Sequence, residues 1–192
     1  VVSHTCMHDD IRKKGSGNAG LTNFLRNFGG WATLLVVLMD MGKVVLACLL
    51  GRWLLPGNPQ LGMMIAGAMT ELGHIFPVFY GFRGGKGVVT TAAMMLLLDW
   101  RVFLICFAVF LLVFLKKRMV SLSSITAAAI YPVVTFCMTY FVDCCVGGLP
   151  VLYVVMATLV AALIGATVII KHRANIKRIR NGTESTISFK KK

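Results

Sequence analysis

The sequence predicts an all-α fold, a polytopic helix bundle embedded in a membrane. Composition gives the first reason, because 57% of the 192 residues are hydrophobic and only 14% are charged, unlike a soluble domain of this length. The second reason is a series of long apolar stretches, and the third is the uneven distribution of positive charge between the loops that join them. We therefore predict one membrane-embedded domain over 15–187, a polar, disordered segment at 1–14 and a basic tail at 188–192.

Six apolar segments are predicted to cross the membrane as helices. A helix needs about 20 residues to cross about 30 Å of hydrocarbon, and most of these segments are close to that length. The third is shorter and rises only about 16 Å as a helix, so it must extend into the glycines before it or lie partly inside the protein. The segments occupy residues 31–55, 61–79, 88–98, 102–115, 124–142 and 151–170.

Charge placement decides whether residues 88–115 form one long helix or two crossings. With two crossings, the loop cations fall on one side of the membrane and the other side keeps only Arg52 and Arg101. A single helix would move the basic run 116–118 to the side opposite the loop at 81–90. The positive-inside rule therefore favours six crossings with both termini in the cytoplasm.

The same topology brings four glycine-rich or basic stretches to the cytoplasmic face of the membrane. This convergence predicts a site for anionic ligands at the inner membrane surface. The net charge of +13 could also indicate nucleic-acid binding, but aromatic and basic residues do not alternate on a soluble face, so we expect no nucleic-acid partner. The four stretches are 15–29, 81–90, 116–125 and 171–184.

The loop at 81–90, GFRGGKGVVT, is typical of a phosphate-binding loop. Glycine lets a ligand approach the backbone N–H groups closely, and Lys86 adds a fixed positive charge. It is not a Walker loop, because Tyr80 stands where that pattern has glycine and Gly87 follows the lysine. An isolated interfacial lysine often only snorkels, but the glycines packed around Lys86 favour a phosphate or oxyanion site.

The stretch at 15–29, GSGNAGLTNFLRNFG, formally matches the dinucleotide pattern G-x-G-x-x-G. That pattern needs a preceding strand and a βαβ unit, whereas here basic residues precede it and a membrane helix follows. A tight turn remains, whose backbone N–H groups, Ser16 hydroxyl and Arg26 guanidinium could hold a phosphate. The alternative is an ordinary cytoplasmic turn with helix-capping residues.

The two remaining stretches add polar side chains to the same face. Ser121 and Ser124 stand where a basic loop enters a helix, although capping serines are common at helix starts. His172 and Asn175 share a helix face after the last crossing, with Glu184 nearby. A basic tail that only contacts anionic lipid requires none of these three residues.

Several ionisable residues lie within the apolar segments. Asp40 and Lys43 stand three residues apart, and because charges inside a membrane are costly unless paired, we interpret them as a helix–helix ion pair. Glu71 has no evident partner in the sequence. His74 fits a packing histidine and a functional one equally well.

These motifs together resemble the PlsY family, the bacterial acyl-phosphate:glycerol-3-phosphate acyltransferases. The family pattern GSGN-x-G-x-TN-x-x-R resembles residues 15–26, and GHIFPVF followed by a GGKG loop resembles 73–87. SLSSI resembles 121–125, and (R/K)H-x-x-NI-x-R-x-x-x-G-x-E resembles 171–184. The similarity covers about residues 10–187 in the family's order and spacing, and this combination of motifs is very specific.

The resemblance implies transfer of a fatty acyl group from acyl phosphate to the 1-hydroxyl of glycerol-3-phosphate, giving lysophosphatidic acid and inorganic phosphate for phospholipid synthesis. It implies that the catalytic residues are Ser16, Arg26, Lys86, His172, Asn175 and Glu184. It implies that the substrate-binding residues are Gly15, Gly17, Asn18, Asn23, Gly84, Gly85, Gly87, Ser121 and Ser124. No cofactor, metal or CoA is expected, because acyl phosphate is already an activated mixed anhydride.

The family has a further transmembrane helix before the first motif, giving seven crossings, and polar residues 1–14 stand in that place here. We therefore expect a chain that lacks the family's first helix. The implied location is the bacterial inner membrane, with the active site facing the cytoplasm and acyl phosphate supplied by a separate phosphate acyltransferase. The alternatives are a membrane protein that binds or transports anions or lipids, and an inactive, truncated acyltransferase. A carrier should contain inverted repeats, and the sequence shows none.

Overall fold

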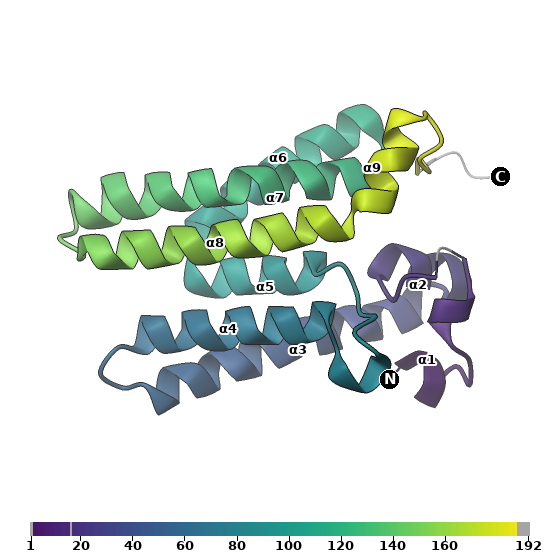
Figure 1. Cartoon of the computed structure of the whole chain (residues 1–192), viewed down its shortest axis with the longest axis horizontal. Coiled ribbons are helices and arrows are strands. Elements are labelled where there is room, and N and C mark those ends of the chain that lie inside the picture. Colours follow the sequence, from purple (N-terminus) through teal and green to yellow (C-terminus); the bar gives the residue numbers. More distant parts are fainter. Residues whose placement is uncertain (1, 16, 188–192) are drawn as a thin grey trace. The chain divides into compact units, whose positions relative to one another are not determined.

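The computed structural model describes residues 2–15 and 17–187, and every regular element in those ranges is helical. The chain divides between Leu98 and Asp99 into two compact units. The first is drawn in purple to teal and the second in teal, green and yellow in Figure 1. The sequence predicted a single membrane domain over 15–187, and the basic tail at 188–192 lies outside the described residues.

The first unit is built around an antiparallel pair of long helices, α3 and α4 (Figure 1). Asn58 accepts a hydrogen bond from the N–H of Leu61 and Pro59 begins α4, both favourable at a helix N-terminus. The short helix α5 contacts both long helices, and its Met94 is completely buried. In order, the elements are α1 (Val2–Thr5), η1 (Ile11–Lys13), α2 (Leu21–Phe28), α3 (Gly30–Leu54), α4 (Pro59–Ile75), η2 (Val78–Tyr80) and α5 (Val88–Leu98).

The N-terminal residues 2–14 differ from the disordered segment that their polarity predicts. They contain α1 and the 3-10 turn η1, and they contribute Val2 and Ile11 to an apolar cluster with Phe24 and Ala32. Val2 and Ile11 pack against side chains of α2 and α3, and no local sequence pattern reveals these distant partners.

The second unit contains three long helices, with α7 in contact with both α6 and α8. Asp99 has an extended backbone and accepts the N–H of Arg101, so it ends the preceding helix and caps α6. Residues 88–115 therefore form two helices and not one. The elements are α6 (Trp100–Lys117), α7 (Val120–Cys137), the π-helix η3 (Met138–Cys144), α8 (Val151–Lys171) and α9 (Arg173–Arg180).

Four helical stretches of the described chain are long and apolar enough to cross a membrane. They are α3, α4 continued to Tyr80, α7 continued to Cys144, and α8. Helix α5 is shorter, and α6 is apolar between Arg101 and Lys116. All six apolar segments predicted from the sequence are therefore helical, while the number of crossings stays a prediction.

Candidate active site

The glycine-rich loop folds back onto the end of α4. Helix α4 stops at Ile75 before Pro77, and the N–H of Phe82 donates to the carbonyl of Pro77 over 3.0 Å. The N–H of Gly85 donates to the carbonyl of His74 over 3.3 Å. The last turn of a helix leaves carbonyls without intrahelical partners, and here the loop supplies the donor.

Two of the loop's glycines are required by their surroundings. A Cβ on Gly85 would overlap Nε2 of His74, so the loop can lie this close to α4 only without a side chain. Gly87 has φ +82°, and a Cβ there would overlap the carboxylate oxygen Oε1 of Glu71. Glycine is therefore required at positions 85 and 87 so that the loop can pack against α4.

Lys86 lies, partly buried, just before the N-terminus of α5. The carbonyl of Gly87 accepts the N–H of Thr91 at 2.8 Å and the hydroxyl of Thr90 at 3.0 Å, which begins the helix. The hydroxyl of Thr91 also donates to the buried Glu71, at 3.0 Å, and this gives Glu71 the partner that the sequence left open. Lys86 thus stands beside a helix N-terminus, whose N–H groups and dipole favour an anion.

Asn23 organises the first motif from within. Its amide NH2 group has two hydrogens for three carbonyls, those of Lys14 and Asn18, each 3.0 Å from the nitrogen, and that of Ile11 at 3.3 Å, so one hydrogen is shared. The side chain is buried and faces these carbonyls, whereas we predicted it to bind substrate. Three chain segments are held together by one amide, which fixes the turn around Gly15 and Gly17.

The other predicted residues of this motif differ in their surroundings. The side-chain oxygen Oδ1 of Asn18 is buried with no hydrogen-bond partner in the described part of the chain. Arg26 lies exposed on α2, and Ser16, predicted to be catalytic, lies outside the described residues. A buried acceptor of this kind is costly unless a ligand or water donates to it.

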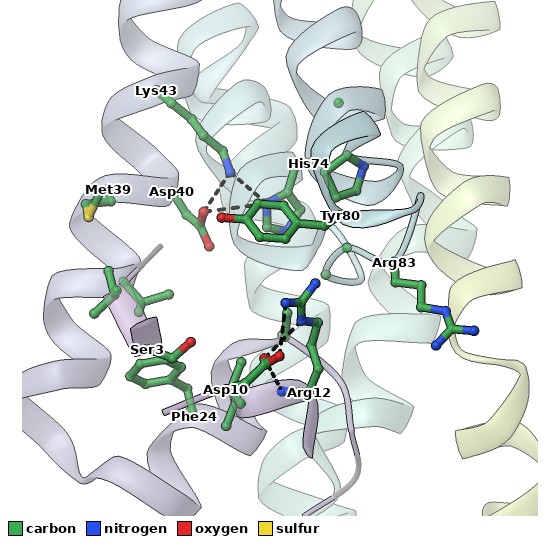
Figure 2. A pocket seen from close by; sticks show the side chains of 18 residues that line it. Ser3, Asp10, Arg12, Phe24, Met39, Asp40, Lys43, His74, Tyr80 and Arg83 are labelled. Carbon is green, nitrogen blue, oxygen red and sulfur yellow. Dashed lines mark hydrogen bonds and ion pairs between the residues drawn. The ribbon is translucent and has the colours of Figure 1, made fainter. Parts of the chain in front are cut away.

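Both motifs of the first unit contribute to one cleft of about 350 Å³. Figure 2 shows its wall, where the guanidinium of Arg12 lies 4.8 Å from the ring centroid of Tyr80. Asp10 accepts two hydrogen bonds from the same guanidinium, at 2.9 and 3.0 Å, and this bonding raises the pKa of Arg12. Arg12 therefore connects the segment before the first motif to the start of the glycine loop.

The cleft is mixed in character. Its described lining includes apolar side chains of α2 and α3, and also Arg83 and the main chain of Gly84 and Gly85. Arg26 and Lys86 are not part of that lining. The contact between Arg12 and Tyr80 has no local signal in the sequence, where Arg12 lies in an ordinary basic segment and Tyr80 only departs from the Walker pattern.

In the second unit, Glu184 is the centre of a hydrogen-bonded cluster. Its Oε1 accepts from the hydroxyl of Ser121 and the amide of Asn175, both at 2.7 Å, and its Oε2 accepts from Nε of Arg178 at 2.6 Å. Burial raises the pKa of Glu184, but these three donors outweigh it and leave the pKa below its ordinary value. Three of the predicted site residues are thus brought together: Ser121, Asn175 and Glu184.

His172 stands at the junction of α8 and α9 and is almost completely buried. Its Nδ1 lies 2.8 Å from the carbonyl of Val168, which can only accept, so Nδ1 carries a proton. In the neutral ring Nε2 is then an acceptor. Ser124 bonds the carbonyl of Val120 in its own helix, at 2.9 Å.

The sequence matches one family over almost its whole length. The sequence profile of the glycerol-3-phosphate acyltransferase family matches residues 1–182. The chain belongs to the glycerol-3-phosphate acyltransferase family. A relative from Syntrophomonas wolfei with that name is 42% identical over 181 residues, 94% of this chain and 85% of the relative. A relative of the same name from Lactiplantibacillus plantarum is 37% identical over 190 residues, 98% of this chain and 84% of its own length.

Two solved structures have a similar fold. Both are crystal structures of PlsY (YgiH), described as an integral membrane glycerol 3-phosphate acyltransferase, and each is 33% identical, with 97% of this chain and 86% of that chain covered. The TM-score is 0.79 for the glycerol 3-phosphate form and 0.77 for the lysophosphatidic acid form. These matches confirm the predicted family, the all-α membrane fold and the activity of a glycerol-3-phosphate acyltransferase in phospholipid synthesis.

Proposed function

We propose that the acyl donor of this membrane acyltransferase is acyl phosphate and that the loop 84–87 binds its phosphate. The observation that carries the donor assignment is the loop itself, with Gly84, Gly85 and Gly87 around Lys86 and with Lys86 beside the N-terminus of α5. The N–H groups at a helix N-terminus and a fixed cation together suit a phosphoryl group that leaves as an anion. The acceptor, glycerol-3-phosphate, brings a second phosphate, for which we propose Arg26, Ser16 and the turn around Gly15 and Gly17.

The reaction needs no covalent enzyme intermediate. The 1-hydroxyl oxygen of glycerol-3-phosphate forms a bond to the acyl carbonyl carbon, and the bond from that carbon to the phosphate oxygen breaks. The phosphate leaves with the bonding electron pair, and the hydroxyl proton passes to the leaving phosphate or to a histidine base. Lys86 and the neighbouring N–H groups stabilise the oxyanion of the tetrahedral intermediate, while both substrates are held in reacting geometry.

The residues of the second unit take positioning and proton-transfer roles in this proposal. His172 can accept a hydrogen bond at Nε2, since its Nδ1 is engaged by Val168. Asn175 orients the glycerol-3-phosphate hydroxyl with His172, and Glu184 holds Asn175. Ser121 and Ser124 complete the substrate-binding set, with Ser121 bound to Glu184.

We further propose that the enzyme lies in the bacterial inner membrane with the site open to the cytoplasm. The cytoplasmic placement is supported by the positive charge of the loops that carry the motifs. A separate phosphate acyltransferase would supply the donor, because acyl phosphates hydrolyse readily and are made where they are used.

The test measures phosphate release and lysophosphatidic acid formation by the purified protein in detergent or nanodiscs. The wild type should turn over acyl phosphate with glycerol-3-phosphate, and Lys86→Ala and Arg26→Ala should each lose at least tenfold in kcat/KM. Phe79→Ala is a suitable control, because that side chain is 97% exposed and lines no part of the described cleft. Turnover of acyl-CoA in place of acyl phosphate would refute the donor assignment, and full activity of both variants would refute the roles of the two cations.

A further inference from the structure

A polar cluster within the helices of the first unit has no part in the chemistry proposed above. Nζ of Lys43 lies 2.7 Å from Oδ1 of Asp40, and also 2.7 Å from Nδ1 of His74. Nδ1 of His74 is 3.5 Å from the same carboxylate oxygen. Figure 2 shows the three side chains directed toward one another, Asp40 and Lys43 from α3 and His74 from α4.

The contact with Lys43 sets the protonation of the His74 ring. A lysine ammonium has hydrogen-bond donors and no acceptor, so Nδ1 at 2.7 Å must be the accepting nitrogen. A neutral imidazole that accepts at Nδ1 carries its proton on Nε2. The ion pair therefore fixes both the orientation and the tautomer of this ring.

The other edge of the same ring faces the glycine loop. Nε2 lies where a Cβ of Gly85 would be, and the carbonyl of His74 accepts the N–H of Gly85 at 3.3 Å. The carbonyl of His74 also lies where a Cβ of Gly84 would be. One residue thus contacts both glycines, through its ring and through its main chain.

We propose that Asp40, Lys43 and His74 are positioning residues, which hold the main chain of Gly84 and Gly85 in its phosphate-binding conformation. The ion pair fixes the ring, and the ring supports the loop, so none of the three side chains needs to touch a substrate. An ion pair that only neutralised two membrane-embedded charges would be complete within α3, since Asp40 and Lys43 lie on one helix face. Neutralising the two charges does not require the additional contact of Lys43 with His74 on α4. The catalytic consequence rests on the proposed donor site.

The test removes both charges together in the double variant Asp40→Asn with Lys43→Met. Asp40 and Lys43 are only partly buried, and replacing both partners of an ion pair together leaves no unpaired charge behind, so we expect the protein to fold. Hydrogen–deuterium exchange of the amides of residues 82–87 should be at least tenfold faster than in the wild type. The KM for acyl phosphate should rise at least tenfold, while the KM for glycerol-3-phosphate should stay within twofold, a split that mere loss of folded protein does not produce.

The matched control removes a different ion pair from the second unit, by Arg101→Met with Asp143→Asn. Nη2 of Arg101 bonds both carboxylate oxygens of Asp143, at 2.9 and 2.8 Å, and both residues belong to the second unit, whereas the loop belongs to the first. This variant should keep the wild-type exchange of residues 82–87 and the wild-type KM for both substrates. The same changes in the control as in the test variant would overturn the proposal.

A second variant, His74→Asn, covers the case in which the double variant does not fold. Asparagine keeps an amide group near Nδ1 to accept from Lys43, but it removes the ring edge that lies against Gly85. Faster loop exchange in His74→Asn supports the proposal, and wild-type exchange in any folded variant of the cluster overturns it. If the wild type uses a donor other than acyl phosphate, the exchange measurement still decides the role of the cluster. Failure of the donor assignment is therefore visible separately, in the wild-type kinetics.

Discussion

Replacing Gly85 by alanine should damage the enzyme through one identifiable collision. The new Cβ would overlap Nε2 of His74 and would lie 2.9 Å from Cε1. The ring cannot swing away cheaply, because Lys43 holds its opposite edge at 2.7 Å. Overpacking of this kind costs about 1–3 kcal/mol. If that cost falls on the conformation that binds the donor, kcat/KM should fall roughly 5- to 150-fold.

The assay is a double-mutant cycle in kcat/KM, with Gly85→Ala, His74→Ala and the two combined. Removing the ring gives the alanine at position 85 room, so the combined loss should be smaller than the product of the two single losses, by about tenfold. Gly84→Ala is the control, since its Cβ would overlap the main-chain oxygen of His74 and lie 2.6 Å from Cδ of Pro77. Truncating the His74 side chain cannot relieve that collision, so the losses in kcat/KM of Gly84→Ala and His74→Ala should multiply in the combined variant. Multiplicative losses for Gly85→Ala as well would refute the steric argument.

Three further predictions concern the polar side chains that hold the two motif regions. Glu184→Gln should lower the melting temperature most at neutral pH, and the melting temperatures of the two proteins should converge on acidification. The reason is that the pKa of Glu184 is lowered in the folded protein, so its stabilisation is present above the unfolded-state pKa of about 4.3 and is lost as the pH falls through the lowered pKa. Asn23→Ala should cost about 1–3 kcal/mol in the free energy of unfolding, because three carbonyls lose their donor, and the exposed Asn27→Ala should cost less in the same denaturation assay. Ser121→Ala should lower the melting temperature through its lost bond to Glu184, whereas Ser124→Ala should leave the melt near wild type; equal melts for the two serine variants would contradict this.

Much of the fold follows from local patterns in the sequence. Apolar runs of sufficient length predicted the helices, and such runs depend only on neighbouring residues. The break in 88–115 was predicted from the charge of the loops, and the structure places it at Asp99, the cap of α6. The order of residues 2–14 was not predictable in this way, because Val2 and Ile11 are buried by partners distant in sequence.

The candidate site was predictable in its residue types but not in their partners. The glycine loop and Lys86 are recognisable as a motif in the sequence, since the spacing of glycines and a cation is local. The inward orientation of Asn23 depends on carbonyls brought together by the fold. The link from Lys43 to His74 joins residues 31 positions apart, and the sequence showed only the pair with Asp40. Predicted roles in direct substrate contact remain predictions for all of these residues.

The bonds of Glu184 have a practical consequence for making the protein. Residues 181–187 return to the start of α7, with Ser121 bound to Glu184 and the N–H of Ile187 bonded to the carbonyl of Arg118 at 2.9 Å. An affinity tag or reporter fused within these residues would break the hydrogen bonds that connect the segment after α9 to the start of α7. Fusions and protease sites therefore belong after Ile187, and a flexible spacer there would let the purification handle extend without pulling on Glu184.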